Sequence, residues 1–294
     1  MQHITLKFST LCLTAATIAL TACGNTAKEA ASEVVETTAS AVQSTTASPL
    51  QSVIDHPRRD EERARDQFRN PKETLEFFGI APGQHVIELW PGWYTNVIAP
   101  YTKETGGTYT AVLFPDLNER LIARSAAFKE NYSDTEAYGD IQYGSYFRDQ
   151  NNMTEPGTAD LALTFRNVHN WMGGQYADKV FAAFYEALKP GGILGVVEHR
   201  LPESAEQDPR GRTGYIQQSY MIKLAEDAGF EFVAASEVNA NPKDTADHPF
   251  GVWTLPPSSR TPEEGSEEAE GFDAEFFKSI GESDRATLKF RKPE

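Results

Sequence analysis

The stretch His85-Val86-Ile87-Glu88-Leu89-Trp90 is short and apolar, carries one carboxylate near its end, and lies between Gly83 and Pro91. Runs this apolar are typical of strands that are covered on both faces, as in a parallel sheet. The turn Pro91-Gly92-Trp93-Tyr94-Thr95 follows directly. We therefore predict a buried strand whose carboxyl end opens into a turn.

Further apolar runs repeat this pattern along the chain. They are Thr108–Phe114, Leu161–Phe165, Ile193–Val197 and Phe230–Val233. Apolar residues at helical spacing lie between them, as in Val180, Phe181, Phe184 and Leu188. Alternating strands and helices predict a doubly wound α/β domain with a Rossmann-like sheet. We expect this sheet to be mostly parallel, with Ala286–Phe290 as an antiparallel edge strand.

Local signals also mark one helix before the first strand. Asn70 is expected to cap it, Pro71 suits its first turn, and Glu73 can return to the cap amide. Gly79 is placed to end the helix in a left-handed conformation.

The stretch from Asn241 to Asp284 breaks the alternation. It contains Pro256-Pro257 and a Glu-rich run from Glu263 to Glu270. We predict an irregular insertion that passes over the surface, with the acidic run as a solvated face.

Composition limits the classes of function. The 294 residues include 27 Lys or Arg and 43 Asp or Glu, so the formal net charge is -16. Such a balance repels phosphate backbones and argues against nucleic-acid partners. An apolar fraction of 39% excludes a mostly disordered chain. The two cysteines, Cys12 and Cys23, cannot form a disulfide-stapled scaffold.

The N-terminal segment has the pattern of an export signal. Lys7 precedes an uncharged stretch, Phe8–Ala22, which is too short to span a bilayer. Its end, Leu20-Thr21-Ala22-Cys23, resembles the lipobox of bacterial lipoproteins. The resemblance implies cleavage after residue 22 and a lipid anchor on Cys23, and the Gly24 that follows resembles proteins sorted to the outer membrane. An ordinary signal peptide with a chance cysteine is the alternative.

We therefore expect an exported protein that is anchored in the bacterial envelope, at the outer membrane and facing the periplasm. Residues 23–50 are mostly Ala, Ser and Thr and are predicted to be a flexible tether. Residues 51–294 are then one domain.

Two segments gather polar and aromatic residues behind buried strands, namely residues 88–95 and Arg166-Asn167-Val168-His169-Asn170-Trp171. Ligands of open α/β sheets bind beyond the carboxyl ends of the strands, where the strand order reverses. With Leu188-Lys189-Pro190-Gly191-Gly192 after them, these segments resemble class I S-adenosylmethionine-dependent methyltransferases. The resemblance is closest to a bacterial subfamily with a Trp-Pro-Gly turn and a Tyr-Thr pair, and it extends over roughly residues 58–293.

This resemblance implies residues that bind the cofactor, S-adenosylmethionine. Glu88 matches the acidic position that ends the first strand, and Gly92 a glycine that lets backbone approach the ligand. Asp116 is the available carboxylate for ribose hydroxyls, and Asn167 lies at the strand end that faces the transferred methyl group. The full set of implied cofactor-binding residues is Glu88, Pro91, Gly92, Tyr94, Asp116, Arg166 and Asn167.

His169 and His199 are the candidate acids or bases on the substrate side, since imidazole titrates near neutral pH. A structural role is the alternative for each. We expect no metal at this pair, because neither histidine has a close-spaced partner such as His-x-x-x-His.

Other roles stay open for several residues. Glu88 can pair with Arg166, and Arg166 with Asn167 can satisfy loop amides. Trp90 and Trp93 suit either the core or a pocket wall. A salt-bridged helix surface is expected for the arginines that interleave with acids, Arg58, Arg59, Arg63 and Arg65.

Two functions remain. The first is a membrane-anchored methyltransferase that uses S-adenosylmethionine and acts on a small-molecule acceptor. The second is a non-catalytic lipoprotein of the same fold that binds a ligand or an envelope partner, since Trp93 follows the one glycine of the turn. An open cavity between Gly92, Asp116 and Asn167 favours the enzyme, whereas a cavity filled by Trp93 favours the binder.

Overall fold

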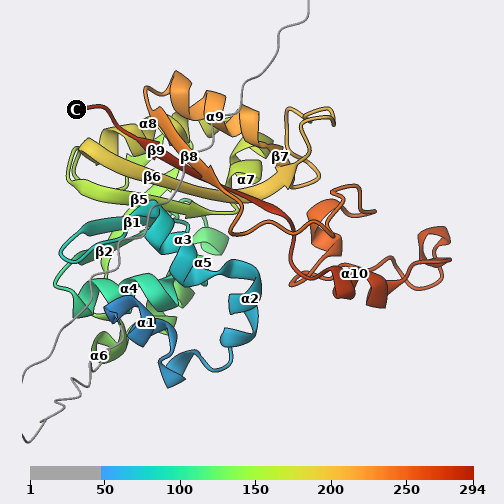
Figure 1. The fold of residues 1–294 in the computed structure, drawn as a ribbon, viewed down its shortest axis with the longest axis horizontal. Helices are drawn as coiled ribbons and strands as arrows, with labels where there is room; N and C mark the ends of the chain where they lie inside the picture. The colour runs from blue at the N-terminus through green and yellow to red at the C-terminus, as the bar shows by residue number, and fades with distance from the viewer. Residues whose placement is uncertain (1–47) are drawn as a thin grey trace, which may run out of the picture. The chain divides into compact units, whose positions relative to one another are not determined.

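The computed structural model describes residues 48–294 (Figure 1). The predicted signal peptide, Cys23 and nearly all of the predicted tether lie outside the described residues. Helix α1 (Pro49–Ile54) opens the described region, and its Leu50 and Val53 are buried. The folded region therefore begins slightly before residue 51, our predicted boundary. None of the helices within residues 48–294 is long and apolar enough to cross a membrane.

Nine strands form one sheet in the order β4-β3-β2-β1-β5-β6-β9-β8, with the short β7 paired to β6. In chain order the strands are β1 (His85–Leu89), β2 (Thr108–Leu113), β3 (Gln142–Phe147), β4 (Gln150–Asn152), β5 (Ala159–Phe165), β6 (Leu188–Leu201), β7 (Ile216–Gln217), β8 (Glu231–Ser236) and β9 (Arg285–Arg291). The predicted apolar runs coincide with strands of this sheet, although β6 begins five residues earlier and takes in Pro190-Gly191-Gly192.

The sheet is mostly parallel. Strands β1, β2, β3, β5 and β6 run parallel, while β9 runs antiparallel to both β6 and β8. The predicted fold class is confirmed, but our placement of the last strand at an edge is wrong. Leu288 and Phe290 of β9 are fully buried, as expected of a strand with a neighbour on each side. The antiparallel strand at one edge of the sheet is β4, which pairs with β3.

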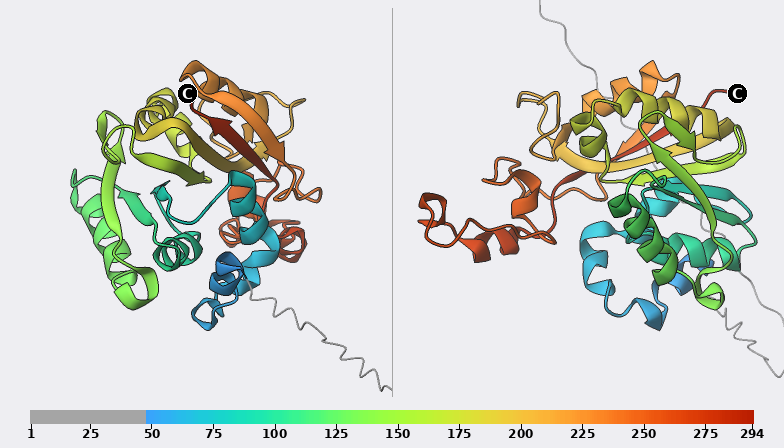
Figure 2. Two further views of the ribbon diagram at one scale, coloured as in Figure 1. Left: turned by 60° about the vertical axis from the view of Figure 1, so that its left-hand side comes forward. Right: turned by 180° about the vertical axis from the view of Figure 1, so that it is seen from behind.

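Helices cover both faces of this sheet (Figures 1 and 2). On one face, Trp171, Phe181 and Phe184 pack with the side chains of β1 and β5. They come from α7 (Val168–Gly173) and α8 (Ala177–Ala187), and α9 (Gln218–Asp227) lies on the same side. The other face is covered by α1, α3 (Pro71–Phe78) and α4 (Thr95–Glu104). The remaining helices along this half of the chain are α2 (Asp66–Arg69), α5 (Glu119–Asn131) and α6 (Thr135–Tyr138).

Helix α3 begins at Pro71 and ends before Gly79, which has a φ of 86°, as the sequence predicts. The expected cap at Asn70 is wrong. Asn70 itself has a φ of 40°, because it also ends α2, and its side chain makes no cap hydrogen bond. Its Nδ2 instead donates to the carbonyl oxygen of Val238 at 2.6 Å, which ties this corner to the segment after β8.

Close contact between α3 and β6 depends on Gly195. A side-chain carbon there would lie 2.7 Å from Phe78 Cγ and from Leu163 Cδ2. We expect Gly195→Ala to lower the free energy of unfolding by about 1–3 kcal/mol through overpacking. Urea denaturation measures the change. The control is Gly173→Ala in α7, where the nearest contact would be 3.5 Å and the change should stay below about 0.5 kcal/mol; equal losses in both variants would contradict the argument.

Residues 241–284 form an irregular insertion without a strand. It contains the short helices η3 (Gly251–Thr254), η4 (Glu267–Ala269) and α10 (Ala274–Ile280). The outer part, which includes the Glu-rich run, projects away from the sheet (red-orange in Figures 1 and 2). The inner part does not lie over an open surface as we predicted, because residues 252–258 form one wall of a cavity at the strand ends.

Candidate functional site

The strand order reverses between β1 and β5. From β1 the chain moves to β2 and β3 on one side, and it then returns to β5 on the other side of β1. Such a reversal opens a crevice at the carboxyl ends of the two strands. Trp90 directly follows β1 and Arg166 directly follows β5, with φ values of 51° and 62°. Left-handed backbone at a residue other than glycine is strained, and such strain concentrates at functional sites.

A cavity of about 310 Å³ occupies this crevice. Its wall includes all but one of the residues that the sequence proposed for the cofactor and for catalysis. These are Glu88, Pro91, Gly92, Tyr94, Arg166, Asn167, His169 and His199. The exception is Asp116, which lines a separate cavity with Lys129 and Ser145. Asp116 lies three residues beyond the end of β2, and the structure does not bring it together with the other candidate residues.

Three residues in this wall were not among the site residues predicted from the sequence. Arg69 comes from the short helix α2, Arg124 from α5, and Trp253 from the insertion. No local pattern pointed to them, because each reaches the cavity from an element far away in the chain. Arg59 forms an ion pair with Asp66, as expected of the salt-bridged arginines, but it is fully buried and does not lie on the surface.

Trp93 belongs to the wall and does not fill the cavity. Its ring lies against the guanidinium carbons of Arg59 and Arg69, at 5.1 and 4.8 Å from the ring centre. Tyr94 is packed beside it, with its ring stacked on Phe165 at 3.8 Å and its hydroxyl donating to the carbonyl oxygen of Arg69. The aromatic residues of the turn therefore support the wall.

Glu88 is a buried acid in this wall, with 2% of its surface exposed. Its carboxylate does not pair with Arg166, the alternative that the sequence left open. It accepts hydrogen bonds from Tyr109 Oη at 2.6 Å and from Thr95 Oγ1 at 3.2 Å. Burial raises the pKa of Glu88 to about 7, although these hydrogen bonds and one from the Gly92 amide act in the opposite direction.

A consequence for stability follows from this raised pKa. The folded state binds the Glu88 proton more tightly than the unfolded state, so Glu88 costs stability as the pH rises from about 4.5 through about 7. We expect the free energy of unfolding of Glu88→Gln, measured relative to wild type, to be higher at pH 8 than at pH 5 by up to about 3 kcal/mol. Thermal or urea unfolding at the two pH values measures it. A variant whose stability relative to wild type is the same at both would contradict the assignment.

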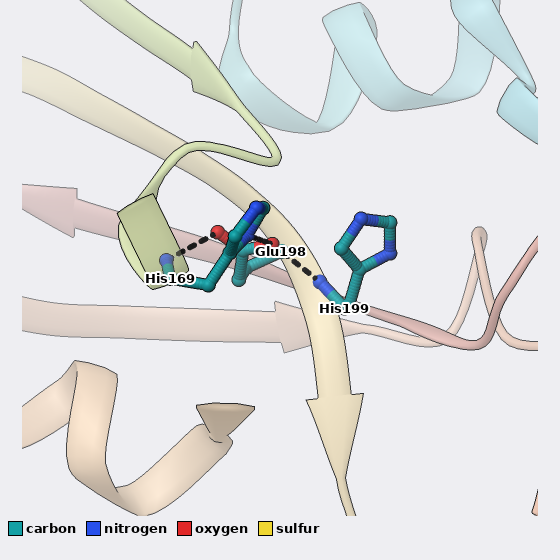
Figure 3. A group of neighbouring side chains, drawn as sticks. All are labelled: His169, Glu198 and His199. Carbon is teal, nitrogen blue, oxygen red and sulfur yellow. Dashed lines mark hydrogen bonds and ion pairs between the residues drawn. The ribbon is translucent and has the colours of Figure 1, made fainter. Parts of the chain in front are cut away.

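His169, Glu198 and His199 form a buried cluster at one end of the cavity (Figure 3). His169 begins the first turn of α7, whereas Glu198 and His199 lie in β6. Glu198 Oε1 lies 3.1 Å from His169 Nδ1, and its two oxygens accept the backbone amides of His169 and His199 at 3.2 and 2.9 Å. The carboxylate therefore fixes the orientation of the His169 ring. His169 Nε2 has no hydrogen-bond partner among residues 48–294.

The other imidazole of this cluster is held differently. His199 Nδ1 lies 2.5 Å from Ser283 Oγ. Burial lowers the pKa of His199 well below its ordinary value, and His169 and nearby arginines, Arg166 first, act in the same direction. His199 is therefore neutral at pH 7 and serves as a hydrogen-bonding group.

The same three side chains offer metal-ligand atoms within 4.8 Å of one another. Our premise that the histidines lack a partner for a metal is therefore wrong, because Glu198 lies between them across the fold. Two observations nevertheless argue against a divalent cation. Glu198 already accepts three N–H or imidazole contacts, and Arg69, Arg166 and Arg285 surround His199 closely enough to lower its pKa.

A second carboxylate holds three arginines beside the cavity. Glu282 is 2% exposed and bonds Arg65, Arg69 and Arg285. The Nε atoms of Arg65 and Arg69 lie 2.6 and 3.1 Å from its oxygens. Burial alone would raise the pKa of Glu282, but the guanidiniums of Arg285, Arg69 and Arg65 outweigh it and hold the pKa at about 2.

Two further cavities adjoin the first around Trp90. Their volumes are about 280 and 360 Å³, and all three cavities have Trp90 and Arg124 in their walls. The Trp90 ring stacks on Phe114 at 4.4 Å, and its Nε1 donates to the carbonyl oxygen of Tyr146 at 3.2 Å. Three cavities therefore meet around Trp90 and Arg124 at the strand ends.

Comparisons with known proteins concern the fold. No protein-family model matches the sequence, and no curated protein matches it. Among solved structures, this chain is similar to an S-adenosylmethionine-dependent methyltransferase from Aquifex aeolicus, with 16% identity, a TM-score of 0.45, and 66% of this chain and 94% of that chain covered.

It is also similar to an S-adenosylmethionine-dependent methyltransferase from Mesorhizobium loti, with 14% identity, a TM-score of 0.44, and 77% and 97% of the two chains covered. A third is phosphoethanolamine N-methyltransferase 2 from Haemonchus contortus, in complex with S-adenosyl-L-methionine, with 14% identity, a TM-score of 0.48, and 85% and 61% covered. These neighbours are S-adenosylmethionine-dependent methyltransferases, and what this chain shares with them is the Rossmann-like α/β fold.

Proposed function

We propose that this chain is an S-adenosylmethionine-dependent methyltransferase that acts on a small-molecule acceptor. One observation carries the proposal: a single cavity at the switch point of the sheet gathers the turn after β1, Asn167 after β5, and a histidine oriented by a buried carboxylate. The order of sequence motifs that resembles class I methyltransferases supports it independently.

In this proposal the cofactor lies against the turn after β1 and Asn167. Gly92 faces open space, since a side-chain carbon there would meet no atom within 4 Å, and the main chain of the turn is thus accessible. Asn167 donates to the carbonyl oxygen of Leu89 at 3.1 Å and thereby holds the ends of β1 and β5 together. Residues of the turn and Asn167 would hold the cofactor. When bound, it supplies a methyl group on a positively charged sulfur.

His169 is the group that takes up the acceptor proton in this proposal. With the cofactor bound, His169 Nε2 would take up the proton that the acceptor nucleophile loses when it receives the methyl group. Glu198 then stabilises the imidazolium, because its Oε1 lies 3.1 Å from Nδ1. Val252, Leu255 and Pro256 of the insertion cover this end of the cavity and limit the access of water.

Calorimetric titration of the full mature chain with S-adenosylhomocysteine, the demethylated cofactor, tests the proposal. We expect binding in the micromolar range, and weaker binding for Gly92→Val, whose side chain would enter the open space beside the turn. Gly173→Ala is the control. Absence of both heat and a thermal shift at millimolar ligand would exclude the enzyme.

A second candidate function is a non-catalytic binder of the same fold. The observation in its favour is the Trp90 ring, which stacks on Phe114 and separates the cavities along the strand ends. Methyl transfer that is abolished by His169→Ala would exclude this alternative.

We also propose, from the sequence alone, that the protein is exported and attached to the bacterial envelope through a lipid on Cys23. Membrane fractionation of wild type and Cys23→Ser tests this location. The wild type should be found with membranes and the variant in the soluble fraction.

A further inference from the structure

Arg166 is a charged group in the cavity wall whose guanidinium has no hydrogen-bond or ion-pair partner among the described residues. No hydrogen bond or ion pair to its side chain occurs within residues 48–294, although its guanidinium lies in the cavity wall. Burial and, to a smaller extent, the nearby Arg285 lower the pKa of Arg166 to about 10. A guanidinium in such a place is stabilised by an anion that enters the cavity.

Arg69 adds a second free donor to the same wall. It is 1% exposed, and its Nη2 is buried without a hydrogen-bond partner, while its Nε is bound to Glu282. Burial and the neighbouring Arg166 lower the pKa of Arg69 to about 9. Two guanidiniums from different elements, α2 and the turn after β5, therefore line one cavity with unused donors.

The Arg166 guanidinium lies near the histidine cluster, because its charge contributes to the lowered pKa of His199 and the Glu198 charge acts on the pKa of Arg166 in turn. The Arg69 guanidinium lies nearer the turn after β1, at 4.8 Å from the centre of the Trp93 ring. An anion bound by both arginines would therefore lie between the His169 cluster and that turn.

We propose that Arg166 and Arg69 form an anion site, and that the methyl acceptor carries a carboxylate or phosphate that binds there. Both anions present paired oxygens that match the fork of a guanidinium. The acceptor role rests on the proposed methyltransferase function, whereas the anion site does not.

Titrations of the full chain with benzoate, inorganic phosphate and neutral benzamide test this site. The protein is first saturated with S-adenosylhomocysteine. We expect one of the anions to bind at least about tenfold more tightly than benzamide, and Arg166→Gln to remove this preference. Arg166→Lys keeps the charge and should retain part of it. The control is Arg212→Gln, because Arg212 is an exposed residue paired with Asp208.

The possible results of these titrations lead to different conclusions about the anion site and the acceptor role. Equal affinity for anion and amide, or anion binding that Arg166→Gln leaves unchanged in a variant with wild-type thermal stability, overturns the anion site. Displacement of benzoate and phosphate by S-adenosylhomocysteine overturns the acceptor role, since the arginines would then hold the cofactor carboxylate. Arg166-dependent anion binding in a protein that does not bind S-adenosylhomocysteine supports the site and overturns the methyltransferase proposal.

Discussion

Glu282→Gln is expected to lower the free energy of unfolding by about 3–5 kcal/mol at pH 7, because it leaves buried arginines without their counter-charge. Glu282 is the shared partner of Arg65, Arg69 and Arg285, and the latter two are 1% and 2% exposed. Equilibrium denaturation in urea measures the loss. A loss below about 1 kcal/mol would mean that water or other groups solvate these guanidiniums.

The same carboxylate predicts a loss of stability in acid. The pKa of Glu282 is lowered from 4.5 to about 2 on folding, so its contribution is fully present above about pH 4.5. It disappears as the pH falls from about 4.5 to about 2, and amounts to about 3 kcal/mol. Glu282→Gln should therefore flatten the acid limb of the stability curve.

A surface pair provides the control for Glu282. Glu76 lies 2.8 Å from Lys72 and is 50% exposed. We expect Glu76→Gln to change the free energy of unfolding by less than about 1 kcal/mol, because exposed ion pairs contribute little. Comparable losses for Glu76→Gln and Glu282→Gln would show that burial is not the cause.

Loss of the His169 imidazole should lower kcat for methyl transfer by about 10²- to 10⁴-fold, the usual contribution of a general base. His169→Ala removes Nε2, the proton acceptor in the proposed reaction. Transfer of a radiolabelled methyl group to a panel of small hydroxy- and amino-carboxylic acids measures it. His56→Asn is the control, because His56 is exposed and caps a short helix through an Nδ1 contact that asparagine can replace.

Glu198→Gln separates positioning from general stability. The variant keeps the shape of the side chain but loses the charge that orients and stabilises the His169 ring. We expect a lower kcat, and an acidic limb of the pH–rate profile that is shifted to lower pH relative to wild type, because His169 must be unprotonated to act as a base and the variant lacks the charge that stabilises the imidazolium. KM for the cofactor should change little. An unchanged pH profile together with a lower melting temperature would indicate a purely structural role.

Residues close together in the sequence made the fold predictable. The apolar runs at β1, β5 and β6 and the glycine after α3 are local patterns, and each led to the correct element. The position of β9 was not predictable in this way, because an apolar run shows that a strand is buried without showing which strands lie beside it. The predicted helix cap at Asn70 was wrong for a related reason, since its side chain bonds to Val238, far away in the chain.

The candidate site likewise contains residues that local sequence patterns predicted and residues that they did not. Residues 88–94 and 166–169 follow strands whose carboxyl ends must meet in a parallel sheet, so their proximity followed from the fold. Arg69 reaches the cavity from α2, Glu198 in β6 contacts His169 of the cavity wall, and Glu282 holds Arg69 from the end of the insertion. Long-range ion pairs of this kind leave no periodic signal in a single sequence.

The central position of β9 also constrains when the protein can fold. Strand β8 pairs only with β9 among the described strands, although β9 follows it by about fifty residues. During synthesis, β6 and β8 would both expose unpaired edges until β9 has emerged. This half of the sheet therefore closes only when residues 285–291 can pair, and a chain that lacks β9 should be retained by chaperones or degraded.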